Sequence, residues 1–305
     1  MNQMQDVVKT YYGETLTSSS DLKTDACTTD ARPPAHVSAA LAAVHDEVAA
    51  RYYGCGLAIP AALDGLNVLD LGSGAGRDVF ALAKLVGPDG HVTGVDMTDE
   101  QLDIARAHEA WHAEKFGYAA PNTRFVKGEL EKLGELDLAP NSFDLIISNC
   151  VINLCTDKPE VFRQAHRLLK PGGELYFSDV YADRRIPQAL VNDPILYGEC
   201  LSGALYWGDY QAIARAADFP VDRRAHGPFG PADNGCRLGR RGRAAAGIGP
   251  FAGRCGEDPA GRIVRGLART HVEILGPAAP EGFLELARFL AQAAEGEQFL
   301  ANHHP

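Results

Sequence analysis

The chain has 305 residues, which is enough to bury a full hydrophobic core and to form one large domain with a smaller one beside it. Its net charge of −11 argues against nucleic acid as a partner, because contacts with phosphates need clustered lysine and arginine. The sequence has no apolar run of the roughly eighteen residues that a membrane span requires and no secretory signal pattern, so we expect a cytoplasmic protein without a membrane partner.

Residues 1–62 form a polar first region that is predicted to be helical. Its clearest helix is expected over 36–51, where apolar residues recur at helical spacing: Val37, Leu41, Val44 and Val48. The helix should end near Gly54. The region also carries Cys27 and Cys55, two of the seven cysteines in the chain. In a reducing compartment we do not expect a structural disulfide framework, so each cysteine is a small buried side chain, a reactive thiol or a ligand for a soft metal.

Residues 63–220 alternate strand and helix patterns and form the second region. Short apolar strands are predicted at 67–71, 91–96, 123–126, 143–148 and 174–180. Helices are predicted between them at 78–85, 99–115 and 160–169. Strands separated by helices predict a parallel sheet with helices on both faces, which is a Rossmann-like, doubly wound α/β fold.

Residues 221–305 form an atypical third region. Glycine, arginine, alanine and proline dominate residues 221–270, and the loss of apolar periodicity predicts a flexible, solvated segment. An arginine–glycine tract that binds RNA is the weaker alternative, since no aromatic residues are interleaved with the arginines. One more amphipathic helix is expected over 280–300.

A glycine-rich turn after the first strand of the second region is the strongest local motif. Gly72, Gly74 and Gly76 alternate with other residues, and glycine lets a backbone turn tightly and approach a ligand closely. The spacing is tighter than the Gly-x-Gly-x-x-Gly turn of dinucleotide-binding domains, so a nicotinamide-binding domain is the weaker alternative. Asp70, just before the glycines, suits a cationic amino group better than a phosphate.

Further polar residues follow the later strands, and their positions predict a nucleoside site. Asp96 ends the second strand, where a carboxylate can bind both hydroxyls of a ribose. Met97 follows and is placed to cover an adenine face, and Glu129, after the third strand, is placed near an adenine amine. Tyr53 and Asn149 complete the expected cofactor-binding residues.

This set of residues resembles the class I S-adenosylmethionine methyltransferases. The resemblance implies that S-adenosylmethionine is the cofactor. It also implies that Asp70 and Gly72 contact the methionine end, Asp96 the ribose, and Glu129 or its neighbours the adenine.

Four cysteines have specific surroundings. Cys150 is the informative one, because it follows the fourth strand, and the end of that strand borders the methyl-donor pocket in this fold. The other three are Cys27, Cys55 and Cys200. No Cys-x-x-Cys pair and no matching histidine pair is present, so a zinc knuckle is excluded. Thiolates from separate segments would suit a soft ion with a lone pair.

The segments that flank these cysteines closely resemble the arsenite methyltransferases. The similar segments are 21–27, 44–48, 51–57, 94–98, 148–154, 172–181 and 198–207, within about residues 6–219. The resemblance implies that Cys150 and Cys200 bind As(III) throughout, that Cys55 completes three-coordinate binding, and that Cys27 exchanges thiols with Cys55. We interpret the remaining cysteines as small buried residues: Cys155, Cys236 and Cys255.

The resemblance also implies a substrate and a partner. The substrate would be a trivalent arsenical, as a thiol adduct, and thioredoxin or glutathione would reduce a disulfide formed during turnover. Two alternatives stay open: a methyltransferase for another small molecule, and a thiol protein that binds metalloids without turnover. After about residue 220 the resemblance ends, and we interpret the third region as a frameshifted or truncated C-terminal domain.

Overall fold

The computed structural model describes residues 3–16, 21, 33–54, 56–182, 185–186, 191, 194–198, 200–219, 263–266 and 270–272. Cys27, Cys55, Cys236, Cys255 and the helix expected over 280–300 lie outside these residues. Among the helices of the described part, none is long and apolar enough to cross a membrane.

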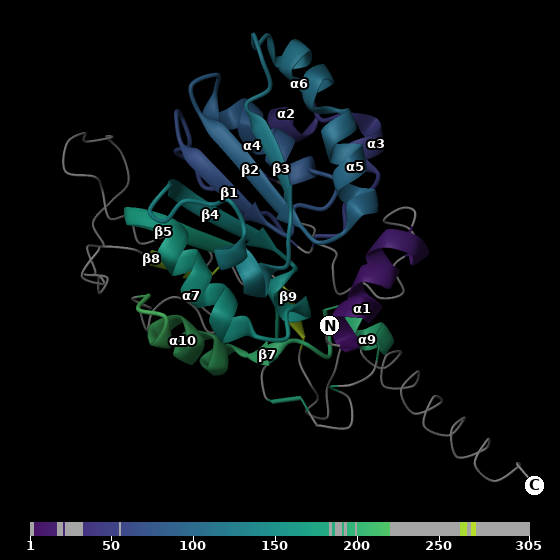
Figure 1. The fold of residues 1–305 in the computed structure, drawn as a ribbon, viewed down its shortest axis with the longest axis vertical. Helices are drawn as coiled ribbons and strands as arrows, with labels where there is room; N and C mark the ends of the chain where they lie inside the picture. The colour runs from purple at the N-terminus through teal and green to yellow at the C-terminus, as the bar shows by residue number, and fades with distance from the viewer. Residues whose placement is uncertain are drawn as a thin grey trace, which may run out of the picture.

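A parallel sheet of six strands, in the order β3-β2-β1-β4-β5-β8, forms the centre of the protein (Figure 1). Its strands are β1 (Asn67–Leu71), β2 (His91–Asp96), β3 (Thr123–Lys127), β4 (Phe143–Asn149), β5 (Leu169–Ser178) and β8 (Ile263–Gly266). The order reverses at β1 and β4, which is where open α/β sheets bind ligands at the carboxyl ends of their strands. The predicted doubly wound α/β fold is confirmed.

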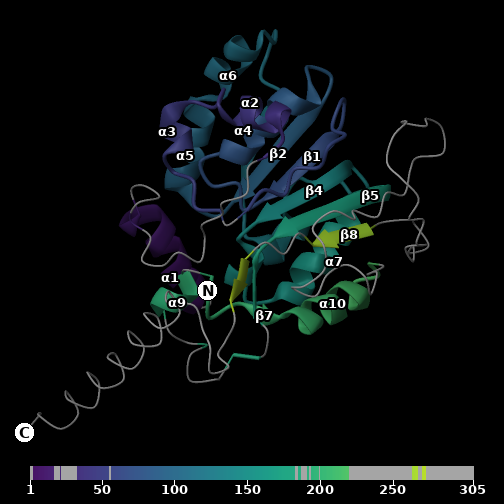
Figure 2. The same ribbon diagram turned by 180° about the vertical axis from the view of Figure 1, so that it is seen from behind.

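Helices cover both faces of the sheet (Figures 1 and 2). One face carries α2 (Ala35–Leu41), α4 (Arg77–Val86) and α5 (Asp99–Ala107); the other carries α7 (Lys158–Leu168) and α10 (Trp207–Ala216). Strand β4 shows why two cores form, because alternate side chains of a strand point to opposite faces. Ile146 is buried in the core under α7, and Ile147 is buried in the core under α4.

Shorter elements extend the sheet edge that holds the carboxyl ends of the strands. A second sheet has the order β7-β6-β9. Its strands are β6 (Val180–Ala182), β7 (Leu205–Tyr206) and β9 (Thr270–Val272). Helices α1 (Gln3–Thr10) and α9 (Pro194–Gly198) pack against each other nearby (Figure 1). Because β6 follows β5 after one residue, the second sheet begins where the main sheet ends.

Two predicted helices are broken in the structure. The helix expected over 36–51 is replaced by α2 and α3 (Asp46–Ala49), because the His45 backbone is extended and its ring Nδ1 accepts a hydrogen bond from the Glu47 N–H at 3.2 Å. The helix expected over 99–115 divides at His108 into α5 and α6 (Glu109–Phe116). The apolar spacing indicated correctly which residues are buried, but it did not indicate where each helix is interrupted.

Two further expectations are corrected at strands. Strand β5 begins at Leu169, earlier than the predicted residue 174, and its pairing with β4 contains a register shift beside Phe143. In the segment expected to be flexible, the structure describes strand β8, which pairs with β5; strand β9 begins at the last residue of that segment and pairs with β6. Backbone hydrogen bonding to an existing strand edge does not depend on apolar periodicity, so the sequence pattern gave no sign of them.

Candidate active site

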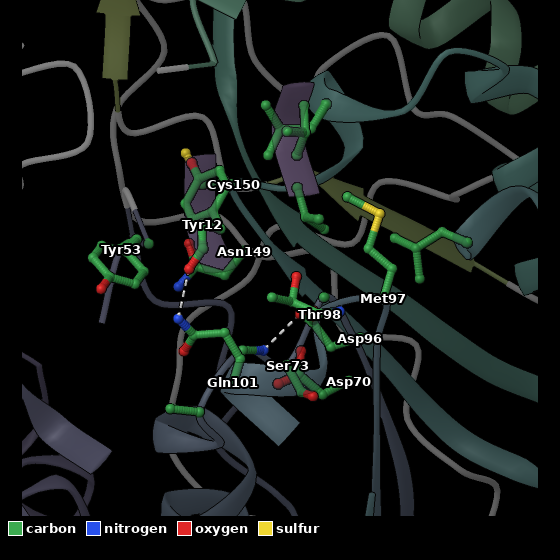
Figure 3. Close-up of a pocket in the computed structure, with 18 of the residues that line it drawn as sticks. Tyr12, Tyr53, Asp70, Ser73, Asp96, Met97, Thr98, Gln101, Asn149 and Cys150 are labelled. Atoms are coloured by element: carbon green, nitrogen blue, oxygen red, sulfur yellow. Dashed lines mark hydrogen bonds between the residues drawn. The ribbon is translucent and has the colours of Figure 1, made fainter. Parts of the chain in front are cut away.

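A cavity opens at the carboxyl edge of the sheet, between the glycine-rich turn, the end of β2 and the end of β4 (Figure 3). In Figure 3, Asp70, Ser73 and Asp96 lie together, and Asn149 and Cys150 lie across the cavity from them. Residues from the N-terminal region complete the wall: Val8, Tyr12, Tyr52, Tyr53 and Gly54. The cavity therefore joins segments that are far apart in the sequence.

The glycine-rich turn shapes the floor of the cavity. Gly74 has a φ of +52°, a conformation that side chains disfavour, and its N–H donates to Asp96 Oδ2 at 2.8 Å. A Cβ atom added at Gly74 would meet no protein atom within 4 Å, so the space beside it belongs to the cavity. At Gly72 the Cβ would instead clash with Val151 at 2.5 Å. Gly74 therefore lets a ligand approach the backbone, whereas Gly72 allows close packing against Val151.

Acidic side chains give the cavity a negative potential. Burial raises the pKa of Asp70 well above its usual value, and the nearby carboxylates of Asp78 and Asp96 raise it further, while Arg77 opposes them. Burial also raises the pKa of Asp96, although the N–H groups of Thr98 and Gly74 donate to its oxygens at 2.9 and 2.8 Å. Buried carboxylates that repel one another are stabilised by a cationic ligand.

These features fit S-adenosylmethionine, which carries an ammonium and a sulfonium. Asp70 lies where a cationic group would relieve the repulsion, and the space beside Gly74 admits a ligand close to the backbone. Ser73 Oγ is buried at the cavity without a hydrogen-bond partner among the described residues, so it has a free polar group to offer. Asp96 retains lone pairs for hydroxyl groups after accepting its two backbone hydrogen bonds.

Asn149 fastens the N-terminal region to the rim of the cavity. Its Oδ1 accepts from the Gly56 N–H at 3.1 Å, and its Nδ2 donates to the Gly56 carbonyl at 2.8 Å. The same Nδ2 approaches Asp78 Oδ2 at 3.0 Å and the Tyr52 hydroxyl at 2.6 Å. Arg77 stacks on the Tyr52 ring, 3.1 Å from its centroid. This network holds Tyr52 at the cavity and Gly56 next to Asn149.

Two cysteines meet where Cys150 lines the cavity. Sγ of Cys150, Sγ of Cys200 and a carboxylate oxygen of Asp179 all lie within 4.8 Å of one another, and all three residues are buried. The Cys200 thiol donates to the Cys150 carbonyl at 3.2 Å. Cys150 is disulfide-bonded, whereas Cys155 and Cys200 form no disulfide. Soft sulfur atoms converging in a buried site suit a thiophilic ion.

The backbone at both cysteines is left-handed, with a φ of +60° at Cys150 and +63° at Cys200. Among the described residues, only Asn141 and Asp218 share this conformation without being glycine. It costs about 1–2 kcal/mol for each residue that has a Cβ atom. Strain of this kind persists where the surrounding structure imposes it, and it clusters at functional sites.

Nearly all of the second region matches one protein family. Residues 62–218, which include the sheet from β1 to β5 and the glycine-rich turn, match the family described as methyltransferase domain. The chain belongs to this family. Its doubly wound sheet and its cavity at the carboxyl edge are those expected of a class I methyltransferase.

Three similar proteins are described more specifically, as methyltransferases that act on arsenite or arsenic (III). An arsenite methyltransferase from Aquipseudomonas alcaligenes is 59% identical over 72% of this chain and 63% of its own length. The arsenite methyltransferase of Homo sapiens is 50% identical over 71% of this chain and 58% of its own. The crystal structure of an arsenic (III) S-adenosylmethionine methyltransferase from Chlamydomonas reinhardtii has 53% identity and a TM-score of 0.60, covering 62% of this chain and 64% of that one. The chain spans about three fifths of the length of these relatives.

The methyltransferase domain brings most of the predicted site residues to the cavity. Those that line it are Tyr53, Asp70, Gly72, Gly74, Asp96, Met97, Asn149 and Cys150. Gly76 lies beneath, where a Cβ would meet the Phe125 ring at 2.8 Å. Glu129 is engaged with Lys132 at 2.7 Å, and its neighbours Gly128 and Leu130 line the cavity instead.

Several residues that line the cavity were not predicted from the sequence. Ser73, Arg77, Asp78 and Gln101 line the cavity, and nothing in their spacing set them apart. Asp179 is different, because it follows β5 at the same sheet edge as Asp96 and Cys150. The rule that ligands bind at the carboxyl ends of parallel strands could have identified it.

Proposed function

We propose that this protein transfers the methyl group of S-adenosylmethionine to trivalent arsenic held by cysteine thiolates. The observation that carries the proposal is the convergence of the Cys150 and Cys200 sulfur atoms at the edge of the cavity, from positions 50 residues apart. The identities with arsenite methyltransferases support the same reading. Arsenic detoxification is the role that this activity would serve.

The donor half of the site would bind and orient the cofactor. When bound, S-adenosylmethionine supplies a methyl group made electrophilic by its sulfonium charge. Asp70 would attract the cationic methionine end, and Asp96 would accept hydrogen bonds from the ribose hydroxyls. Met97 lines the same wall and would contact the adenine. Tyr53, on the N-terminal side, also lines the cavity and would contact the cofactor.

The acceptor half would hold arsenic with its lone pair free. Thiolates of Cys150 and Cys200 would bind As(III), and Cys55, which the resemblance implicates as the third ligand, would leave a pyramidal centre. The arsenic lone pair then forms the As–C bond as the S–C bond of the donor breaks. No proton moves in this step, so positioning supplies much of the catalysis and no general base is required.

A reductant must act on the site before arsenic binds. Cys150 is disulfide-bonded, and a disulfide sulfur cannot serve as a thiolate ligand. Thioredoxin or glutathione would release it by thiol–disulfide exchange, with two electrons and two protons passing to the protein sulfurs. The reductant is therefore part of the proposed cycle, as is an exchange between Cys27 and Cys55.

The test is an assay of the reduced protein with arsenite and methyl-labelled S-adenosylmethionine. Methylated arsenic supports the proposal. Tight arsenite binding without product would indicate sequestration, and the absence of both would indicate a methyltransferase with another acceptor. Cys150→Ser and Cys200→Ser should abolish arsenic methylation and leave donor binding almost intact, because a serine hydroxyl stays protonated and is a poor ligand for a soft ion.

Cys155→Ser is the matched control for these variants. Cys155 is also buried near the cavity, but burial raises the pKa of its thiol well above its usual value, which keeps it protonated. Its Sγ donates to the Val151 carbonyl at 3.5 Å, a contact that serine can replace. Full activity of either Cys150→Ser or Cys200→Ser would refute the arsenic assignment and leave the methyltransferase fold untouched.

A further inference from the structure

A buried carboxylate, that of Asp179, lies beside the two cysteine sulfur atoms and forms no ion pair with any of the described residues. Asp179 is 1% exposed, and a carboxylate oxygen lies within 4.8 Å of both sulfur atoms. Lys158 is the cation that favours its charged form, but Lys158 Nζ donates to the Cys155 carbonyl at 2.7 Å instead. A buried charge without a directly bound cation is costly, so its presence at this position needs an explanation.

Backbone groups fix the orientation of this carboxylate. Asp179 Oδ2 accepts from the Asn153 N–H at 2.9 Å, and Oδ1 accepts from the Val180 N–H at 2.9 Å. Asn153 in turn donates from Nδ2 to the Val180 carbonyl at 2.8 Å and to the Cys200 carbonyl at 3.3 Å. The carboxylate and the Cys200 backbone are therefore held by one rigid, fully buried network.

We infer that Asp179 is a further catalytic residue, whose carboxylate stabilises the positive charge that arrives on arsenic during methyl transfer. The inference rests on the proposed function. As the As–C bond forms and the S–C bond breaks, the electron pair of the broken bond passes to the donor sulfur, and one unit of positive charge moves from that sulfur to arsenic. A preoriented charge of the opposite sign at the point of arrival lowers the barrier without reorganisation.

The surroundings of Asp179 before methyl transfer are consistent with this role. The Asp179 carboxylate accepts hydrogen bonds from the backbone N–H groups of Asn153 and Val180, which are neutral donors. The methylated arsenic centre is cationic and would supply a compensating charge at the moment of transfer. The same carboxylate would offer little to a neutral acceptor bound by the same thiols, so its presence favours an acceptor that becomes charged.

The test compares Asp179→Asn with Asp179→Glu in single-turnover methylation of arsenite by reduced protein. Asparagine keeps the size and removes the charge, and we expect the rate of the chemical step to fall about a hundredfold. Dissociation constants for arsenite and for S-adenosylmethionine, measured by equilibrium dialysis, should stay within about threefold of those of the unmodified protein. Glutamate keeps the charge and should be at least about tenfold faster than asparagine.

Asp144→Asn is the matched control. Asp144 also accepts from a backbone N–H, that of Asn67 at 3.1 Å, and it lies at the opposite end of β4. Its loss should leave the chemical step unchanged. An Asp179→Asn protein that methylates at the unmodified rate would overturn the inference, and so would one that loses arsenite binding, since Asp179 would then only position the thiols.

A second variant decides the matter if Asp179→Asn fails to fold. Asp179→Ser removes the charge and leaves a smaller side chain whose hydroxyl oxygen can accept a hydrogen bond from the Asn153 N–H. We expect the chemical step of the folded variant to be slowed about as much as in Asp179→Asn. A folded Asp179→Ser protein whose chemical step is unchanged would overturn the inference. Unmodified protein that binds arsenite but never methylates it would instead overturn the proposed function, before any variant is compared.

Discussion

A buried histidine should make the free energy of unfolding decrease at acidic pH. His112 is 2% exposed and stacks on Phe80 with ring centroids 3.6 Å apart. Its Nδ1 donates to the His108 carbonyl at 2.8 Å, so its Nε2 accepts from the His45 N–H at 3.1 Å in the neutral ring. Protonating Nε2 removes that acceptor and places a charge in the core. Burial accordingly lowers the pKa of His112 from 6.5 to about 4.

The sign and size of the effect follow from linkage. A histidine whose pKa is lowered in the folded state contributes stability above pH 6.5, and this contribution is lost as pH falls towards 4. At pH 5 the unfolded chain binds almost one proton at this position and the folded chain almost none. With pKa values of 6.5 and about 4, the free energy of unfolding should drop by about 2 kcal/mol between pH 8 and pH 5.

Urea denaturation at the two pH values measures this drop. The unmodified protein should lose about 2 kcal/mol more than His112→Gln does between pH 8 and pH 5. His36→Gln, at an exposed position, is the control and should behave as the unmodified protein does. Asp70 and Asp96 bind protons more readily when folded and act in the opposite direction, but they are present in every variant and cancel in the difference. Equal losses in the unmodified protein and His112→Gln would refute the reasoning.

Three further predictions concern the cavity and one helix end. Gly74→Ala should weaken S-adenosylmethionine binding by at least about tenfold, as measured by calorimetry, because the added methyl group enters the cavity, and it should destabilise the fold by only about 1–2 kcal/mol. Asp70→Asn should weaken the same binding by about ten- to a hundredfold, the worth of a charged hydrogen bond, yet it should raise the melting temperature at pH 8, because a carboxyl whose pKa is raised on folding costs stability as pH rises above its ordinary pKa. A lower melting temperature would contradict this account of the carboxylate cluster. Asp218→Gly should stabilise the protein by about 1 kcal/mol in chemical denaturation relative to Asp218→Ala, because residue 218 follows the C-cap of α10 with a φ of +63° and is exposed.

The positions of the strands could be predicted from the sequence because each strand has a local cause. Residues 67–71 and 91–96 are short apolar runs that end at glycine or aspartate, and the structure has the same bounds for β1 and β2. The breaks at His45 and His108 could not be predicted in the same way. Both histidine rings hydrogen-bond to nearby backbone groups, and these local contacts compete with a continuous helix that the apolar spacing alone would allow.

The cavity was partly predictable for a related reason. Asp70, Asp96 and Asn149 stand at strand ends, and parallel strands bring their carboxyl ends to one edge. What the sequence could not show is how each side chain is used. Asn149 lines the cavity, and its cofactor-binding role stays a prediction, but its amide also bonds to Asp78 and to Gly56, which is 93 residues away. Such pairing depends on tertiary structure and leaves no periodic signal.

The two cysteines show most clearly how local and tertiary causes combine at the site. Position at a strand end explains why Cys150 reaches the cavity, but Cys200 arrives from a turn after α9, where its N–H donates to the Tyr197 carbonyl at 3.0 Å. Both backbones take the left-handed conformation, so each thiol is held at a cost that the surrounding packing must offset. Asn153 and Asp179 supply that packing, since they connect the turn after β4, the start of β6 and the Cys200 carbonyl. The fold itself therefore holds the two sulfur atoms within 4.8 Å of each other, which is the arrangement that the proposed arsenic site needs once Cys150 has been reduced.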